Sequence, residues 1–472
     1  MPRLTQPALP ALPGARLGRA RPSLLANAVQ AIAVLAIPVL ALGLPGAAQA
    51  QSLLTLYDAA RGYDAAYQSA RAQAESLVFR AEQSRAAKRP SVDGTATWAE
   101  SRSESPLAAS TNVSRSSQQS VGLTARYAIF NRSNDKTIAK AEKAIEVART
   151  QLGAVEQDLI VRLVQAYFDV LAASDALATV QTSKTAIAEQ LASAKRNFEV
   201  GTATITDTRE AQARFDLATA QALAAENDLN VKRLALESVV GRAGVVPQRM
   251  AVPVVLPTLS QPNVEDWVSQ ADALSPTLQQ LRLARELARL DTDLARTGNL
   301  PTVGVSASVT EAHTRLAGTS IATGPWGGFG LSGSVAVQLT MPLYTGDLVQ
   351  NRIKETLALE DKAQSDLEAG RRSVAQATRS AFFGVRSLHA QVTALEAAES
   401  SSKLALEATQ LGYKVGVRVN LDVLNAQTQL YQAQRDLARA RYDVVVNSLK
   451  LRQVSGQLQP QDVNAVDALL AR

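Results

Sequence analysis

The sequence predicts an α+β fold built from two copies of one unit, each with a helix, two strands, a long helix and a further helix. The duplication is direct, because Val200-Gly201 recurs as Val415-Gly416 and Asp207 recurs as Asp422, each 215 positions later. Long stretches without proline, rich in Ala, Leu, Gln, Glu and Arg, predict the helices. Short segments in which apolar and polar residues alternate predict the strands.

The chain of 472 residues therefore divides into four parts. We expect a signal peptide over 1–50 and the first structural repeat over 51–246. An extended linker rich in Pro and Val follows over 247–262. The second repeat, with the C-terminal tail, covers 263–472.

The first fifty residues have the order of a secretory signal. The segment contains arginines but no Asp or Glu, and the arginines precede an apolar run over 31–44. Ala48-Gln49-Ala50 then predicts cleavage after Ala50. A transmembrane anchor is the alternative, but the run spans about 14 residues, includes Pro38, and falls short of the roughly 20 that a spanning helix needs. Because we expect no later stretch to be apolar and long enough to span a bilayer as a helix, a membrane-embedded mature protein would need a β-barrel.

Composition argues against an enzyme. The chain has no cysteine, which excludes disulfides, thiolate metal sites and a cysteine nucleophile, and its two histidines, His313 and His389, lie far apart. Residues 328–333 match G-x-G-x-x-G but lead into a strand, so they do not indicate a nucleotide site. No cofactor or metal is expected. The net charge of +6 falls to +2 without the signal peptide. This charge does not indicate binding to nucleic acid.

The helices carry apolar residues at coiled-coil spacing, for example Leu159, Leu163 and Tyr167. One helix over 133–200 would be about 100 Å long. The two shorter helices of each copy nearly equal the long one in length, so we expect them to stack end to end beside it. The predicted helices cover 53–88, 133–200, 205–240, 264–297, 347–415 and 421–454.

The strands alternate clearly in the second copy, where Val335, Val337 and Leu339 share one face while Ser334 and Gln338 share the other. A soluble sheet that packs one face on a core is one interpretation. Strands of about ten residues behind a signal peptide also fit an outer-membrane barrel, apolar outward and polar inward. The predicted strands cover 92–98, 121–129, 301–310 and 331–341, with loops at the strand tips over 101–118 and 314–328.

Four strands cannot close a barrel, since about eight are the practical minimum. An open edge is not tolerated in lipid, so several chains must share one barrel. Two chains would give eight strands and a plugged lumen, whereas three would give twelve and a usable pore.

The turns between the paired helices hold the candidate site residues. Gly201 and Gly416 can end a helix, and Asp207 and Asp422 suit the start of the returning one. Capping alone would explain the two aspartates. It does not explain a group that gathers at the second turn: Tyr413, Arg418, Asp422 and Asn425.

Over essentially the whole mature region the chain resembles the TolC family of outer-membrane channels. The resemblance rests on the duplicated Val-Gly turns and on four segments: Asp207-Thr-Arg-Glu-Ala-Gln212, Asp422-Val-Leu-Asn-Ala-Gln427, Ala166-Tyr-Phe168 and Pro342-Leu-Tyr-Thr-Gly346. It implies a homotrimer in the outer membrane of a Gram-negative bacterium, with a twelve-stranded β-barrel set in outer-membrane lipid and an α-helical coiled-coil tunnel through the periplasm. An inner-membrane transporter and its periplasmic adaptor would open the closed helical tip.

The same resemblance implies roles for the tip residues. Asp207, Tyr413 and Arg418 match the lock that holds the tip shut. Asp422 matches an acidic ring at the pore constriction, and Asn425 stands where the best-known member has a second acid, which halves the expected ring charge. The helix-tip turns, Val200-Gly201 and Val415-Gly416, would contact the adaptor.

The resemblance implies an export duct of a tripartite type I secretion system. Such a duct passes a polypeptide, for instance an RTX-type toxin, from an inner-membrane ABC transporter and adaptor to the outside. Many drug-efflux members carry a lipidated cysteine after the signal, which this chain lacks. Multidrug efflux stays open as an alternative. A trimeric coiled-coil surface fibre would explain the helices but not the duplicated strand pairs.

Overall fold

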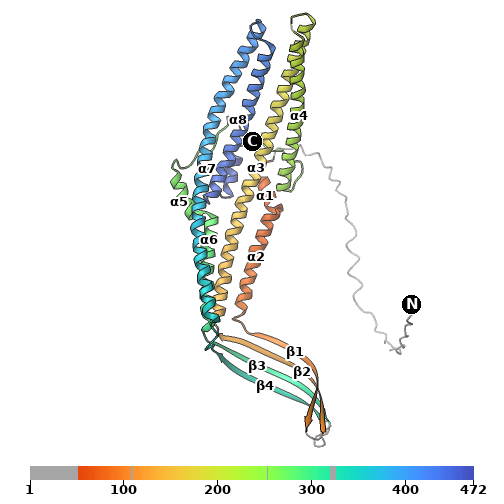
Figure 1. The fold of residues 1–472 in the computed structure, drawn as a ribbon, viewed down its shortest axis with the longest axis vertical. Helices are drawn as coiled ribbons and strands as arrows, with labels where there is room; N and C mark the ends of the chain where they lie inside the picture. Colours follow the sequence, from red (N-terminus) through yellow and green to blue (C-terminus); the bar gives the residue numbers. More distant parts are fainter. Residues whose placement is uncertain (1–50, 108–109, 203, 252, 319–325, 472) are drawn as a thin grey trace, which may run out of the picture. The chain divides into compact units, whose positions relative to one another are not determined.

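The structure is a computed structural model in which a bundle of long helices continues at one end into a four-stranded sheet (Figure 1). The α+β class is confirmed, whereas the predicted signal peptide lies outside the described residues. Those residues are 51–107, 110–202, 204–251, 253–318 and 326–471.

Each copy contains two short helices, two strands, a long helix and a returning helix. In the first copy these are α1 (Leu53–Tyr63), α2 (Ala65–Ala86), β1 (Ser91–Leu107), β2 (Ser110–Phe130), α3 (Arg132–Glu199) and α4 (Ile205–Val240). In the second they are α5 (Val264–Leu274), α6 (Pro276–Arg296), β3 (Thr302–Gly318), β4 (Trp326–Thr340), α7 (Leu348–Lys414) and α8 (Asn420–Val454). A 3₁₀ turn, η1 (Thr297–Asn299), follows α6, and α9 (Gln461–Asp467) lies near the C-terminus.

The helix predicted over 53–88 is broken at Asp64, so the prediction of one continuous helix is wrong there. The Asp64 backbone leaves the helical region (ψ 116°), and its carboxylate accepts a 2.8 Å hydrogen bond from Tyr67 N, which caps α2. Burial alone would raise the pKa of Asp64, but hydrogen bonds from Arg162 and the Tyr67 amide hold it below its usual value. This contact therefore contributes stability above the ordinary carboxyl pKa and loses it as the pH falls.

The helix predicted over 264–297 is broken at the equivalent position, Ser275 (ψ 124°), which corrects that prediction as well. Pro276 follows and occupies the first position of α6. Proline suits the first turn of a helix but forces the preceding residue into an extended conformation, so the sequence itself places the break.

A glycine at the end of each returning helix packs against these breaks. Gly241 follows α4 with φ 73° and lies against the ring of Tyr63, and Gly456 follows α8 with φ 76° and lies against the backbone of Leu274. Both glycines are in the left-handed region that disfavours a side chain. The two copies therefore share this glycine contact as well as the order of their helices and strands.

We expect Gly456→Ala to destabilise the protein by about 1–3 kcal/mol per chain, because the new methyl group would meet backbone atoms in a left-handed turn. Gly241→Ala should cost about 1 kcal/mol, since the atoms nearest to its methyl group belong to the Tyr63 side chain, which is 59% exposed and can move aside. Thermal dissociation of the assembled protein, followed by gel mobility, compares the two. Equal losses would contradict this account.

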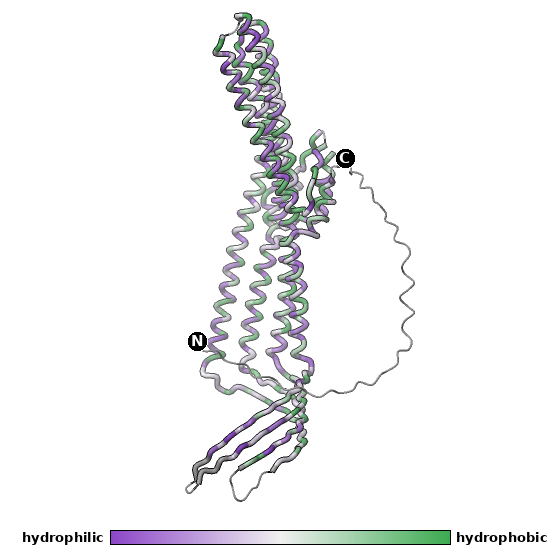
Figure 2. Tube along the Cα trace, turned by 90° about the vertical axis from the view of Figure 1, so that its right-hand side faces the viewer, coloured by the Kyte–Doolittle hydropathy of each residue, from purple (hydrophilic) through white to green (hydrophobic). Residues whose placement is uncertain are grey.

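In each copy the leading helices and the returning helix lie end to end beside the long helix, as expected. In Figure 1, α2 runs along the sheet-proximal part of α3, and α4 runs along the remainder. Arg85 of α2 pairs with Glu142 of α3 at 2.6 Å. The second copy repeats the arrangement, with α6 and α8 against α7, and Figure 2 shows the bundle from the side.

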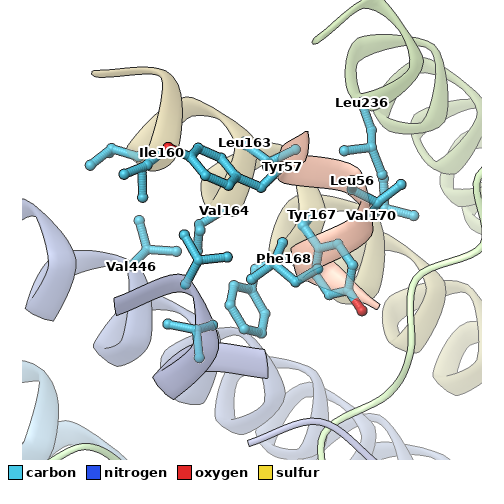
Figure 3. Packing of buried hydrophobic residues seen from close by; sticks show 14 of the residues in the cluster. Leu56, Tyr57, Ile160, Leu163, Val164, Tyr167, Phe168, Val170, Leu236 and Val446 are labelled. Atoms are coloured by element: carbon cyan, nitrogen blue, oxygen red, sulfur yellow. The ribbon is translucent and has the colours of Figure 1, made fainter. Parts of the chain in front are cut away.

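The largest core cluster lies where α1, α3, α4, α8 and α9 meet, so residues of both copies build it (Figure 3). At its centre, the Phe168 ring lies 5.7 Å from the Tyr167 ring, edge to face, and 5.4 Å from the Tyr442 ring of α8. Tyr442 also donates a 2.5 Å hydrogen bond to Asp175 of α3. Burial of this cluster holds α8 of the second copy against α3 of the first.

One helix among the described residues, α3, is long and apolar enough to cross a membrane by length and composition, contrary to the sequence expectation. Its most apolar 18-residue window has mean hydropathy 1.2, and 44% of that window is buried inside the protein. Leu159, Leu163 and Val164 of this helix are fully buried in the core cluster. The hydropathy of α3 is therefore that of a core helix.

The four strands form one antiparallel sheet in the order β1-β2-β3-β4. The strands are longer than predicted, and most of the loop predicted over 101–118 is strand, with Ser101 opposite Ser116 and Ser103 opposite Ser114. The loop predicted over 314–328 is likewise partly strand. These loop predictions were wrong because ladder hydrogen bonds pair the backbone of Ser- and Thr-rich segments even where the apolar alternation has ended.

The sheet has two chemically different faces. On the apolar face, Tyr127, Val305 and Val337 form one row across three strands, and Val337 is 70% exposed. On the polar face, the Ser308 and Ser334 hydroxyls lie 2.9 Å apart. An exposed apolar face that extends across several strands needs an apolar environment or a partner to cover it.

Candidate functional site

Two helical turns lie at the end of the bundle opposite the sheet (Figure 1). The first joins α3 to α4 and the second joins α7 to α8. Gly201 and Gly416 have φ 77° and 78°, and the preceding Val200 and Val415 share φ −90° and ψ 3°. The glycines supply the left-handed conformation that ends each long helix, as expected.

The first turn is held by a capping box. Asp207 Oδ2 accepts hydrogen bonds from Thr204 N at 2.9 Å and from Thr204 Oγ1 at 2.8 Å. In return, Thr204 Oγ1 accepts a 3.2 Å hydrogen bond from Asp207 N. Capping by Asp207 is therefore confirmed.

The second turn is built differently, and the expectation that Asp422 caps its helix is wrong. Val419 occupies the capping position of α8 and has no side-chain acceptor to offer. The Asp422 carboxylate instead lies 3.5 Å from Nη1 of Arg418, which precedes it by four residues in the turn before α8. Gly412 makes room for Arg418, because a methyl group there would meet the arginine side chain. An ion pair thus stands where the first copy has a capping box.

Two hydrogen bonds join the tips within one chain. Tyr413 Oη accepts a 3.2 Å hydrogen bond from Asn197 Nδ2, and Asn425 Oδ1 accepts a 3.2 Å hydrogen bond from Arg214 Nη2. Leu424 of α8 is also buried in a small cluster with residues of α3 and α4. Tyr413 and Asn425, both named from the sequence, therefore each contact the other hairpin.

Asn197, Thr204 and Arg214 are site residues that were not predicted from the sequence. Comparison of the two copies at the 215-residue offset could have found them, since each is replaced in the second copy: by Gly412, Val419 and Gln429. Polar residues that only one copy has are candidates for contacts that the other copy does not make.

The predicted lock residues make three separate contacts inside the chain. Asp207 binds Thr204, Tyr413 binds Asn197, and Arg418 pairs with Asp422. A link between Arg418 and Asp207 stays a prediction about neighbouring chains of an assembly.

The chemistry available at the tips is that of ion pairs and hydrogen bonds. Throughout the part of the chain that the structure describes, no group of three or more His, Asp or Glu side chains could hold a metal ion. His389 contacts the Pro257 carbonyl at 3.1 Å, and His313 stacks on Phe329, so the two histidines are in different parts of the fold.

The family model described as "Outer membrane efflux protein" matches residues 56–242 and 267–457, one segment in each copy. The chain is 32% identical over 438 residues to outer membrane protein TolC of Vibrio cholerae, covering 90% of this chain and 95% of that protein. It is 31% identical over 348 residues to the alkaline protease secretion protein AprF of Pseudomonas aeruginosa, covering 72% of this chain and 69% of that protein.

The fold is also that of a solved structure, the outer membrane protein VceC of Vibrio cholerae. The TM-score is 0.69 at 18% identity, over 86% of this chain and 96% of the VceC chain. At this identity the likeness supports the fold alone.

Proposed function

The chain belongs to the outer membrane efflux protein family, the TolC family, and from this premise we propose that it is the export duct of a type I secretion system. It is an outer-membrane channel protein whose long helices form a periplasmic tunnel. In our proposal, an inner-membrane ABC transporter and a periplasmic adaptor deliver a polypeptide, such as an RTX-type toxin, into the tunnel. The duct carries it through the outer membrane without chemical change.

The observation that carries the channel function is the sheet with opposite faces and two open edges. The apolar face suits lipid, and the polar face, with Ser308 and Ser334, suits a water-filled lumen. In the described sheet, β1 and β4 are edge strands whose outer backbone groups have no partner strand within the chain. Because lipid cannot satisfy these groups, the edges must pair between chains, and three chains supply twelve strands.

Features of the helical tips support a gated entrance. Asp207, Tyr413 and Arg418 would form the lock, while Asp422 and Asn425 would line the constriction. The adaptor would cover the turns, whose apolar side chains have no cover in the chain itself: Val200, Val415 and Val417 are 73%, 66% and 75% exposed.

Two observations favour a polypeptide as the cargo. AprF is by its name a protein that serves protease secretion, and it matches 72% of this chain. The chain also lacks a cysteine for the lipid anchor that many drug-efflux members carry. The family description names efflux, so export of small toxic molecules is the second candidate.

Deletion of the gene tests the proposal. We expect one or more large polypeptides to disappear from the culture medium and to reappear when the gene is supplied again, with little change in sensitivity to small antibiotics. The reverse result, unchanged secretion with increased sensitivity, would favour multidrug efflux. In the same strains, the protein should remain in the sarkosyl-insoluble fraction and migrate as a trimer without heating, and a soluble monomer would contradict both functions.

A further inference from the structure

The apolar face of the sheet changes character toward the strand tips. Trp98, Gln119, His313 and Phe329 lie in one row across the four strands on this face, and the His313 ring stacks on Phe329 at 4.2 Å. On the helix side of this row the face is mostly apolar, with Glu311 in the adjoining row as a charged exception. Aromatic residues of this kind mark the level at which a membrane protein leaves the hydrocarbon region.

Three arginines follow on the same face, beyond the aromatic row. Arg315 lies in the next row, opposite Ser117, and Arg102 and Arg115 lie directly opposite each other in the row after it. All three line one cavity of about 910 Å³, together with His313 and Glu100. We call Arg102, Arg115 and Arg315 the arginine cluster.

The arginine cluster is neutralised only in part within the chain. Arg102 pairs with Glu104 at 2.5 Å, and Arg315 Nε donates a 3.0 Å hydrogen bond to His313 Nε2. Among the described residues, Arg115 has no ion-pair partner. Like charges directly opposite on neighbouring strands repel, so an anion between Arg102 and Arg115 would relieve that cost. Guanidinium groups bind phosphate in particular, through paired N–H donors.

The position of the arginine cluster in the membrane identifies the source of the phosphate. The helices lie in the periplasm, so the strand tips face the outside of the cell. Arg102 lies four residues beyond Trp98, about 13 Å along a strand and about 10 Å along the membrane normal for a tilt of about 40°. That height corresponds to the headgroups of the outer leaflet.

We propose that the arginine cluster binds the phosphate groups of the outer-leaflet glycolipid, lipopolysaccharide. The acyl chains of the same lipid molecule would cover the apolar face below, next to Trp98 and Phe329. Glu100 and Glu104 also lie at this level, and their negative charges offset those of the arginines. The surface as a whole should therefore bind free anions only weakly. A ligand with both phosphates and acyl chains fits both parts of the surface.

The first test uses the unchanged trimer. After purification in detergent and removal of bound lipid, it is incubated with bisphosphorylated lipid A or with lipid A stripped of phosphate, and retained lipid is measured by native mass spectrometry. We expect bisphosphorylated lipid A to be retained about tenfold or more strongly, because charge-assisted hydrogen bonds are lost with the phosphates. Equal retention of both lipids would overturn the proposal. This comparison needs no variant, so it stands whatever a variant does to assembly.

A triple variant, Arg102→Gln, Arg115→Gln and Arg315→Gln, locates the site. It should lose the preference for phosphorylated lipid, whereas Arg126→Gln should keep it. Arg126 is the matched control because it lies on the polar face of the same sheet, paired with Asp93 at 2.7 Å. Retained preference in a correctly assembled triple variant would contradict the assignment. If inorganic phosphate stabilises the trimer as well as bisphosphorylated lipid A does, the site binds free phosphate and the lipid assignment is wrong.

Discussion

Val337→Arg is expected to remove most of the assembled channel from the outer membrane, while Ser334→Arg leaves assembly intact and changes conductance. Val337 is 70% exposed on the apolar face, in a row with Val305 and Tyr127. An arginine that faces lipid costs about 2–4 kcal/mol at the middle of a bilayer and less toward either surface, and Val337 lies eight residues from the aromatic Phe329 along β4. A homotrimer would bear that cost three times, so the yield of trimer from membrane fractions on unheated gels should fall sharply.

Ser334→Arg is the matched substitution, three residues away on the same strand and on the opposite face. It removes the contact between the Ser334 and Ser308 hydroxyls, which is worth about 1 kcal/mol or less. The new side chain would enter the lumen, where water can solvate its charge, so single-channel conductance should change instead. Equal tolerance of the two substitutions would mean that the faces do not separate lipid from lumen.

The sequence predicted the helices and the duplication well because both are local or periodic properties. The breaks at Asp64 and Ser275 were missed, although Pro276 marks one of them, because the residues around them are otherwise good helix formers. The strand ends were missed for another reason. Ladder hydrogen bonds form between backbones whatever the side chains are, so the loss of alternation beyond Trp98 did not mark the end of β1.

The site was predictable only in part. The residue type and position of Asp207 were enough to predict its cap, but the same reasoning failed for Asp422, whose neighbour Arg418 offers a charged partner. The contacts of Tyr413 with Asn197 and of Asn425 with Arg214 join helices more than 200 residues apart in the chain. No periodicity along the sequence specifies such pairs, which depend on how α7 and α8 pack against α3 and α4.

Arg418→Ser is expected to raise the conductance of the closed channel in planar bilayers and to sensitise cells to large antibiotics, with the trimer yield unchanged. The arginine is 61% exposed, so its ion pair contributes little to folding. Exposed pairs are worth about 0.2–1 kcal/mol each, and three copies would act on one opening equilibrium. A combined shift of about 1–3 kcal/mol changes the open population by roughly five- to 150-fold. Tyr413→Phe should add to the effect, because the hydroxyl that accepts the Asn197 hydrogen bond is lost.

The partner of Arg418 in the lock can be found with two charge-neutral substitutions. Asp207→Asn keeps an oxygen that can cap α4 but removes the negative charge, so it should open the channel as Arg418→Ser does if the two residues pair between neighbouring chains. Asp422→Asn removes the partner that Arg418 has within its own chain and should leave Arg418 free to pair with Asp207. If only Asp422→Asn reproduces Arg418→Ser, the lock is the pair inside one chain. If Arg418→Ser itself conducts like the unchanged channel, the arginine has no part in the gate. Asp207 then only caps α4 and stabilises the turn.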